Sequence, residues 1–325
     1  METRAVCIPK RLPPEQWEKA ADAAAIINPV NRAAVHRLTR IMPGFVPTKA
    51  HLAVLTTKYW GPKGVRLTVG FMDNPSVELR KRIVEHMNAW GSTANVTFVE
   101  ARTDPQVRIA RTPGNGHWSY LGTDILLIGK DEPTMNLDSF TMSTAESEYK
   151  RVVRHEAGHT LGFPHEHMRK ALVAKIDVRK AIDYFGRHYG WSADDVKLQV
   201  LTPLEESSLI GTASTDARSI MCYQLPGEIT KDGEPILGGT DIDAWDREFI
   251  ALIYPRIESK PKPEPKPTRK KKRTTRRKPS SKKKVPSRTP VKKTAAKKTA
   301  AKKTAAKKTA KRKSAAKSRP RSARR

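Results

Sequence analysis

The clearest alternation of apolar and polar residues begins at residue 65. Its apolar members are Val65, Leu67, Val69 and Phe71, with Arg66, Thr68 and Gly70 between them. A period of two is typical of a half-buried β-strand, so this pattern predicts a strand. Shorter apolar runs predict further strands at residues 96–99, 107–110, 125–128 and 134–140, with a glycine-punctuated loop at 114–122.

Helical periodicity follows the first strand and returns in the second half of the chain. Pro75 favours a helix start, and an apolar stripe then runs along Val77, Ile83, Val84, Met87 and Trp90. Ser143 and Glu146 have the spacing of a capping box, which predicts a helix that runs to about Leu161 and ends at Gly162. Further helices are predicted at residues 13–40, with a break at Asn28-Pro29, and at 178–189 and 243–253.

The order of these elements predicts an α+β fold, because strands come first and helices later. We expect residues 1–55 to be an N-terminal extension, either a packed appendage or a removable pro-segment. Residues 56–257 then form the main domain, with a ligand held between its two halves. From residue 258 prolines alternate with charged residues, and Lys-Lys-Thr-Ala-Ala repeats between Lys292 and Lys311, which predicts a disordered Pro/Lys/Ala-rich tail.

Charge is divided very unevenly along the chain. The formal net charge is +30, but residues 258–325 hold 31 Lys and Arg against two acidic residues. Residues 1–257 retain 32 basic and 31 acidic residues and are nearly neutral. We therefore expect any nucleic acid or other polyanion to be bound through residues 260–325, by backbone charge rather than base stacking, because aromatic residues are missing there. The alternative is a solubilising or surface-adhering tail.

Cys7 and Cys222 are the only cysteines, too few for the disulfide framework of a small secreted domain. The N-terminus has no apolar run of signal-peptide length, and no stretch reaches the roughly 18 apolar residues of a membrane helix. These features favour a location of the protein inside the cell, and export by a non-classical route is the alternative. We assume a monomer.

The segment from His155 to His165 carries the strongest chemical signal. His155 and His159 are four residues apart, so on a helix they lie on one face and can share a metal ion. A catalytic zinc ion needs a third protein ligand and one open position. His165 supplies that ligand if the chain turns back at Gly162. The pattern predicts one catalytic Zn²⁺ held by three histidines.

Glu156 adjoins a predicted ligand and is the candidate general base. Zinc lowers the pKa of a bound water to roughly 7, and a neighbouring carboxylate can accept its proton and later donate it to the leaving amine. This chemistry predicts a zinc metalloendopeptidase that hydrolyses peptide bonds with a zinc-activated water. A closed structural zinc site is the alternative, but it needs a fourth strong ligand and leaves Glu156 without a chemical role.

The run His155-Glu-Ala-Gly-His-Thr-Leu-Gly-Phe-Pro-His-Glu166 resembles the metzincin clan of zinc peptidases, and within it the astacin-like metallopeptidases with their bacterial relatives. Ser219-Ile-Met-Cys-Tyr223 resembles the Met-turn of that clan. The resemblance spans roughly residues 58–255. It implies a two-subdomain fold with the active-site cleft between the subdomains, Met221 as an apolar floor below the zinc, and Tyr223 as an additional ligand or a donor to the tetrahedral intermediate.

The same resemblance guides expectations about substrate and activation. In such folds the strand before the motif helix binds extended peptide at a sheet edge, and residues 134–140 are our candidate. Glu166 in the family pairs with a newly freed N-terminus. This chain departs from the family pattern, because it lacks the cysteines of the animal domains, has Cys222 at a position that is commonly His, and has no clear inhibitory pro-segment motif.

Another histidine and both cysteines are further candidate ligands. His167 is expected to be exposed, because three ligands are already assigned. Cys222 as a thiolate ligand and Cys7 as a cap that keeps the enzyme latent are alternatives without a supporting motif, and Cys222 more simply fills a small space beside Met221. The Lys/Ala-rich tail resembles those of linker histones and bacterial nucleoid proteins. The competing function is therefore a non-catalytic polyanion- or DNA-binding protein with a protease-like domain.

Overall fold

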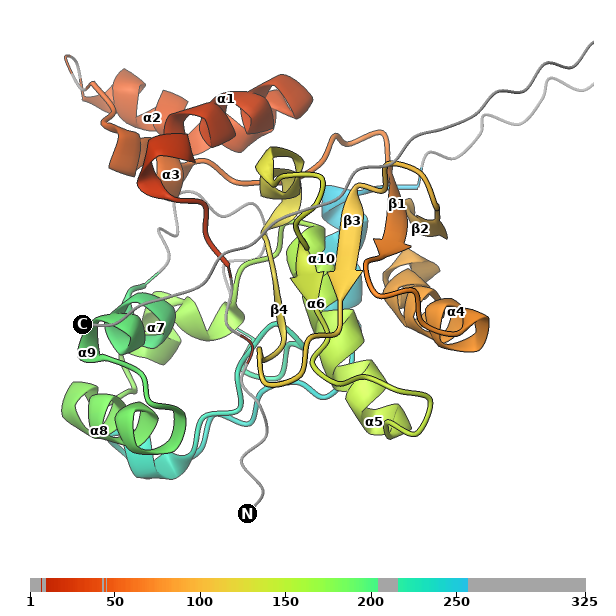
Figure 1. Cartoon of the computed structure of the whole chain (residues 1–325). Helices are drawn as coiled ribbons and strands as arrows, with labels where there is room; N and C mark the ends of the chain where they lie inside the picture. Colours follow the sequence, from red (N-terminus) through yellow and green to blue (C-terminus); the bar gives the residue numbers. More distant parts are fainter. Residues whose placement is uncertain (1–6, 8–9, 43, 45, 204–215, 257–325) are drawn as a thin grey trace, which may run out of the picture. The chain divides into compact units, whose positions relative to one another are not determined.

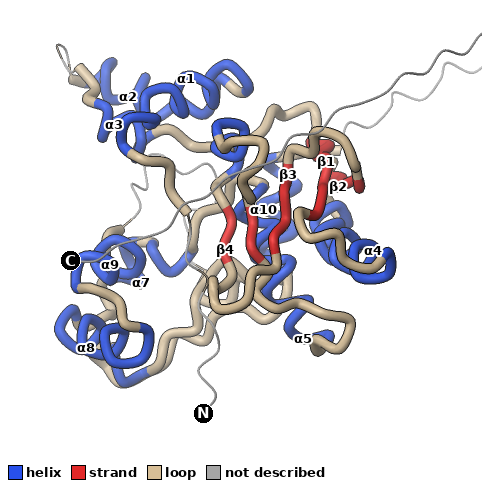
Figure 2. The backbone as a smooth tube through the Cα atoms, in the orientation of Figure 1, coloured by secondary structure: helices blue, strands red, loops and turns tan. Residues whose placement is uncertain are grey.

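A five-stranded mixed sheet forms the centre of the structure (Figures 1 and 2). Its strands are β1 (Val65–Phe71), β2 (Val96–Glu100), β3 (Val107–Ala110), β4 (Trp118–Ser119) and β5 (Met135–Asn136). Their order is β2-β1-β3-β5-β4, with parallel neighbours except for the antiparallel pair β4 and β5. The short strand β4 therefore lies at one edge of the sheet.

The computed structural model describes residues 7, 10–42, 44, 46–203 and 216–256. These residues belong to one compact unit, Met1–Lys262. The predicted tail at 258–325 lies outside the described residues, so its properties stay predictions, as do the domain boundaries at 55 and 257. None of the helices in the described ranges has the length and hydropathy needed to cross a membrane.

Two predicted strands differ in the structure. Residues 125–127 belong to a 3₁₀ turn, Gly122–Leu127, and Ile128 follows it, so this segment is not a strand. Strand β5 lies inside the sheet, so the prediction that residues 134–140 form the edge is wrong; the edge strand is β4, within the predicted loop. The side chain of Asn136 donates to the carbonyl oxygen of Gly116 at 2.6 Å and accepts from the amide of Thr112 at 2.9 Å. These bonds hold the loop against β5, and β4 within that loop pairs antiparallel with β5.

The helix that carries the histidine motif is composite. It consists of α5 (Glu146–Glu148), a π-helical turn (Tyr149–Val153) and α6 (Arg154–Thr160). The predicted capping box is wrong, because the helix begins after Ala145 without a side-chain cap and Ser143 pairs with Thr141 instead. Its end at Gly162 is confirmed, with a φ of +97° that favours glycine.

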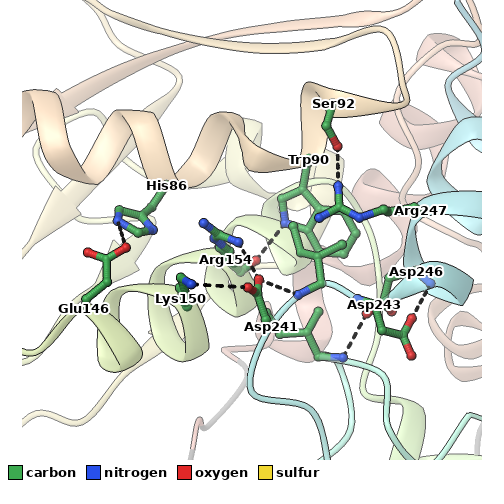
Figure 3. A network of polar contacts seen from close by, with 12 residues as sticks. His86, Trp90, Ser92, Glu146, Lys150, Arg154, Asp241, Asp243, Asp246 and Arg247 are labelled. Atoms are coloured by element: carbon green, nitrogen blue, oxygen red, sulfur yellow. Dashed lines mark hydrogen bonds and ion pairs between the residues drawn. The ribbon is translucent and has the colours of Figure 1, made fainter.

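Polar contacts fix this helix against its neighbours (Figure 3). The indole of Trp90 donates to the carbonyl oxygen of Arg154 at 2.8 Å. The guanidinium of Arg154 pairs with Asp241, and the ammonium of Lys150 lies 3.9 Å from the same carboxylate. Near the helix start His86 lies 3.4 Å from Glu146. The composite helix is thus held by α4 and the turn that follows it, and also by Asp241 in the C-terminal segment.

The remaining helices surround this centre (Figure 1). The longer ones match the predicted ranges and are α1 (Trp17–Ile27), α2 (Ala33–Ile41), α4 (Val77–Met87), α8 (Val178–Tyr189) and α10 (Ala244–Ile253). Shorter helices are α3 (Lys49–Leu55), α7 (Lys170–Val173) and α9 (Ala193–Val196). Single turns occur at Pro14–Gln16, Pro29–Arg32, Asn88–Ser92, Glu166–Met168, Lys197–Leu201 and Gly227–Ile229.

Two apolar clusters divide the domain into the two expected halves. The larger cluster joins the sheet, α4 and the motif helix, with Trp90, Ile83 and Tyr149 almost fully buried. The smaller one joins α8 to the segment around residues 222–236 and includes Phe185 and Cys7. The motif helix belongs to the first cluster and Tyr223 to the second, so the metal-binding residues lie where the two clusters meet.

Candidate metal centre

Three histidine side chains converge as the sequence predicts. Helix α6 presents His155 and His159, and the chain reverses after it so that His165 returns to the same point. The Nε2 atom of His165 lies 3.1 Å from Nε2 of His155 and 3.0 Å from Nε2 of His159. All three residues are at least 93% buried. Zinc bonds of about 2.0–2.1 Å at the tetrahedral angle place two ligand nitrogens about 3.3 Å apart, close to these distances.

The tautomers of two of these rings explain why they need a cation. Nδ1 of His155 lies 2.6 Å from the carbonyl oxygen of Ile220, and Nδ1 of His159 lies 2.7 Å from that of Phe163. A carbonyl oxygen only accepts, so both Nδ1 atoms donate and both Nε2 atoms carry lone pairs. Lone pairs that face one another at this distance repel, and a metal ion between them removes the repulsion. These residues therefore fit a zinc ion.

Burial also keeps the rings neutral, as metal binding requires. The pKa values of His155 and His165 lie well below the usual range. Desolvation is the largest cause, and electrostatic repulsion from the neighbouring imidazoles is the second. Burial lowers the pKa of His159 to about 4. At neutral pH the site thus presents three uncharged imidazole rings.

The turn that returns His165 is fixed by long-range contacts to the end of α6. The indole of Trp60 donates to the carbonyl oxygen of Thr160 at 2.9 Å, and the hydroxyl of Tyr254 donates to that of Leu161 at 2.6 Å. These bonds satisfy carbonyl groups that a helix end leaves unpaired. Phe163 packs between Trp90 and Phe249. The geometry of the third ligand therefore depends on residues about 100 positions away on both sides.

Met221 lies against α6, as the Met-turn resemblance implies. A Cβ atom on Gly158 would come within 2.5 Å of its sulfur, so a side chain at position 158 would displace the Met221 thioether. Asp246, from α10, accepts hydrogen bonds from the hydroxyl of Ser219 at 2.6 Å and the amide of Ile220 at 3.0 Å. The turn is thereby anchored to the last helix, and its Ile220 carbonyl orients His155.

Glu156 and Tyr223 both lie beside the histidines. Glu156 is 1% exposed, and burial raises the pKa of its carboxyl to about 8. The Tyr223 ring centroid lies 4.2 Å from that of His165, and burial raises the pKa of its hydroxyl, so it remains protonated. One Glu156 oxygen and the Tyr223 hydroxyl have no hydrogen-bond partner among the described residues. Both polar atoms are therefore free to meet a ligand.

A cleft of about 700 Å³ opens onto these residues. His155, Glu156 and Tyr223 line one part of it, and Tyr184, Phe185 and Leu237 line another. From the sequence alone, the irregular segments near 196–217 and 225–239 are expected to shape this pocket. Residues of the second segment do line the cleft, and so do residues of helix α8, which were not expected there. Residues 204–215 of the first segment lie outside the described ranges.

Three residues near the site differ from expectation or add to it. His167 is fully buried, not exposed, and its ring stacks on Tyr223 with centroids 4.0 Å apart. Cys7 lies with the three histidines, and the potential ligand atoms of all four are within 4.8 Å of one another. Glu166 accepts from the amide of Asp216 at 3.2 Å and pairs with Arg169. Nothing local in the sequence signals the first two placements, because both depend on distant segments.

Similarity to known proteins covers the same region. A sequence model of the Astacin peptidase family matches residues 55–185. Zinc metalloproteinase nas-27 of Caenorhabditis elegans is 34% identical over 125 residues, which are 38% of this chain and 27% of that protein. This chain therefore matches about a quarter of the length of that relative. The structure of myroilysin is similar at 32% identity and a TM-score of 0.59, over 63% of this chain and 98% of that chain.

Proposed function

Because this chain belongs to the astacin family of zinc metallopeptidases, we propose that it is a zinc-dependent endopeptidase that cleaves polypeptides. The observation that carries the proposal is the convergence of three Nε2 atoms beside a buried carboxylate and a buried hydroxyl, both with unpaired atoms. Such a set offers a metal site, a base and a hydrogen-bond donor in one cleft.

The roles of the side chains follow from their chemistry. His155, His159 and His165 would hold a zinc ion, which would supply a Lewis acid for the scissile carbonyl and for the attacking water. Glu156 takes the proton of the attacking water and passes it to the leaving amine. A metal cation beside this carboxylate favours its ionised form, which opposes the effect of burial on its pKa. Tyr223 keeps its proton and donates a hydrogen bond to the developing oxyanion.

The competing function is a non-catalytic polyanion-binding protein. A domain kept only for its shape has no need for a buried carboxylate with an unpaired oxygen, since an unpaired buried polar atom costs stability. Glu156 and Tyr223 are both present and both have unpaired atoms. These features favour catalysis.

The test is the substitution Glu156→Gln in the full chain, with cleavage of an unfolded protein as the readout. The amide cannot accept a proton, so we expect kcat/KM to fall at least a thousandfold while one zinc ion per chain remains bound. Glu85→Gln, on an exposed position of α4, is the matched control and should cleave at the wild-type rate. Unchanged cleavage by the Glu156 variant would rule out the mechanism.

We also propose that residues 260–325 tether this peptidase to a polyanion. The support is the division of charge, with a nearly neutral domain and a tail that carries almost the whole excess of Lys and Arg. If residues 258–325 form the flexible coil that their composition predicts, these 68 residues would span roughly 45 Å, enough for cleavage to occur beside the bound polyanion.

A further inference from the structure

His117 lines the same cleft as His155 and Glu156 but does not belong to the metal-binding cluster. It directly precedes β4, the edge strand of the sheet, and the residue is 8% exposed. A neutral imidazole has one nitrogen that accepts a hydrogen bond and one that donates. The tautomer of the ring therefore decides what His117 can bind in the cleft.

The backbone of the segment after β5 fixes this tautomer. The amide of Asp138 donates to Nδ1 of His117 at 3.1 Å. An amide nitrogen only donates, so Nδ1 carries the lone pair and Nε2 carries the proton of the neutral ring. Burial is the largest cause that lowers the pKa of His117 to about 4, and the positive charge of Arg151 is the second. At neutral pH the ring is therefore an uncharged N–H donor.

The tautomer of His117 is opposite to that of two metal-binding rings. Nδ1 of His155 and Nδ1 of His159 donate to carbonyl oxygens, which leaves a lone pair on each Nε2 atom for a metal ion. Nε2 of His117 is protonated and has no hydrogen-bond partner among the residues that the structure describes. A protonated nitrogen cannot bind a metal ion. The His117 ring is thus suited to a ligand that accepts a hydrogen bond.

Contacts on two sides hold the His117 ring in place. It packs edge-on against Phe140, with ring centroids 5.5 Å apart and an interplanar angle of 80°. The amide of the preceding residue, Gly116, donates to the Asp138 carboxylate at 2.8 Å, and the Gly116 carbonyl oxygen accepts from Asn136 at 2.6 Å. A donor that is fixed before its ligand arrives loses little conformational freedom on binding.

The charged donor close to His117 in the cleft is already paired. Arg151 donates to the Glu148 carboxylate through Nε at 3.1 Å and through Nη2 at 2.7 Å, so its charge is balanced within the protein. His117 offers an uncharged N–H group, which suits an uncharged acceptor. The uncharged acceptor that every polypeptide carries is its main-chain carbonyl oxygen.

We propose that the Nε2–H group of His117 donates a hydrogen bond to a main-chain carbonyl oxygen of the peptide substrate and so holds the peptide in the cleft beside the metal centre. The proposal rests on the proposed function, because it assigns a substrate-binding residue to the same cleft. An extended peptide that binds along this edge of the sheet brings its carbonyl groups past residue 117. The bond involves only the peptide backbone, so it favours no particular substrate sequence.

Two substitutions in the full, zinc-loaded chain separate the two ring nitrogens. In His117→Asn the amide oxygen replaces Nδ1 as acceptor, and the Nε2–H donor is lost. In His117→Gln the amide nitrogen replaces Nε2 as donor, and the acceptor for the Asp138 amide is lost. For an uncharged peptide we expect kcat/KM to fall about threefold to tenfold in His117→Asn, mostly through KM, and to stay within about twofold in His117→Gln. His36→Asn, at an exposed position of α2, is the control and should cleave at the wild-type rate.

Thermal unfolding of the same variants should show the opposite order. His117→Gln should be less stable than His117→Asn, because only the glutamine variant loses the bond from the Asp138 amide. Impaired cleavage in His117→Gln with normal cleavage in His117→Asn, or equal losses in both, would show that the ring acts only through its structural contacts and would overturn the proposal. A loss confined to peptides with acidic or amide side chains would also overturn it, because the acceptor would then be a side chain.

Peptide binding without cleavage distinguishes this proposal from the proposed function. In chains that also carry Glu156→Gln, the Kd of the same uncharged peptide, measured by calorimetry, should rise about threefold to tenfold with His117→Asn and stay unchanged with His117→Gln. That order, together with no cleavage by the wild type, would refute the endopeptidase and retain His117 as a peptide-binding residue. Cleavage by the wild type with no difference among the His117 variants would refute the role of His117 and retain the endopeptidase.

Discussion

The hydroxyl of Tyr223 is buried beside the metal centre without a hydrogen-bond partner among the described residues. Leaving a buried hydroxyl unpaired costs about 1–3 kcal/mol, so its position needs a reason other than stability. Stacking on His167 restricts its ring, with an interplanar angle of 15°. A restricted donor with a raised pKa is suited to stabilise an oxyanion that forms during the reaction.

Tyr223→Phe tests this role because it removes only the hydroxyl. We expect kcat to fall about 10²–10³-fold, the range measured for the loss of one oxyanion donor, with KM and zinc content little changed. Steady-state kinetics on a peptide substrate, with metal analysis of the same sample, measure both. A loss of bound zinc would instead identify Tyr223 as a ligand, and unchanged kcat would refute both roles.

The convergence of the three histidines could be predicted from sequence because it depends largely on local geometry. His155 and His159 share a helix face by their spacing, and Gly162 allows the reversal that returns His165. Cys7 and His167 could not be placed in this way. Cys7 lies three residues before Lys10, whose amide donates to the carbonyl oxygen of Ser119, and His167 stacks on Tyr223, 56 residues later in the sequence. Neither contact leaves a periodic pattern.

At the scale of elements, α10 stabilises the metal centre through the Met-turn. The carboxylate of Asp246 accepts from the Ser219 hydroxyl and from the amides of Ile220 and Asp243. The Ile220 carbonyl in turn orients His155 at 2.6 Å. The last helix therefore acts on a ligand without touching the metal position.

Asp246→Ala should destabilise the domain, because it leaves three buried or half-buried donors without their acceptor. We expect the free energy of unfolding to fall by about 2–4 kcal/mol, measured by urea denaturation. Glu248→Ala, an exposed position on the same helix, is the control and should change stability by less than about 0.5 kcal/mol. Equal stability of the two variants would contradict the anchoring role.

Elements with a strong period were predictable, and short irregular ones were not. Strand β1 and helix α8 have the predicted bounds, Val65–Phe71 and Val178–Tyr189, because each buries one regular face. Strand β4 has only two residues and lies in a glycine-rich segment. Its pairing depends on the hydrogen bonds of Asn136, a tertiary interaction that periodicity does not report. The sequence pattern therefore misplaces the edge of the sheet.

At the scale of the whole molecule, the charge division predicts a separable tether. Deleting residues 258–325 should leave peptide cleavage unchanged and weaken binding to duplex DNA at roughly 0.1 M salt at least a hundredfold. For the full chain, the slope of log K against log salt should be at least about 5 in magnitude, as for six or more neutralised phosphates. Fluorescence anisotropy over a salt series measures this. Equal DNA binding by the two chains would eliminate the tether.

The proposed peptidase depends on one zinc ion held by three histidines. The most direct measurement removes the metal from the full chain with a chelator and then titrates zinc back, while cleavage of an unfolded protein is followed. We expect cleavage to disappear with the metal and to return in proportion to added zinc, with a plateau at one ion per chain. Cleavage that survives complete removal of zinc would contradict it.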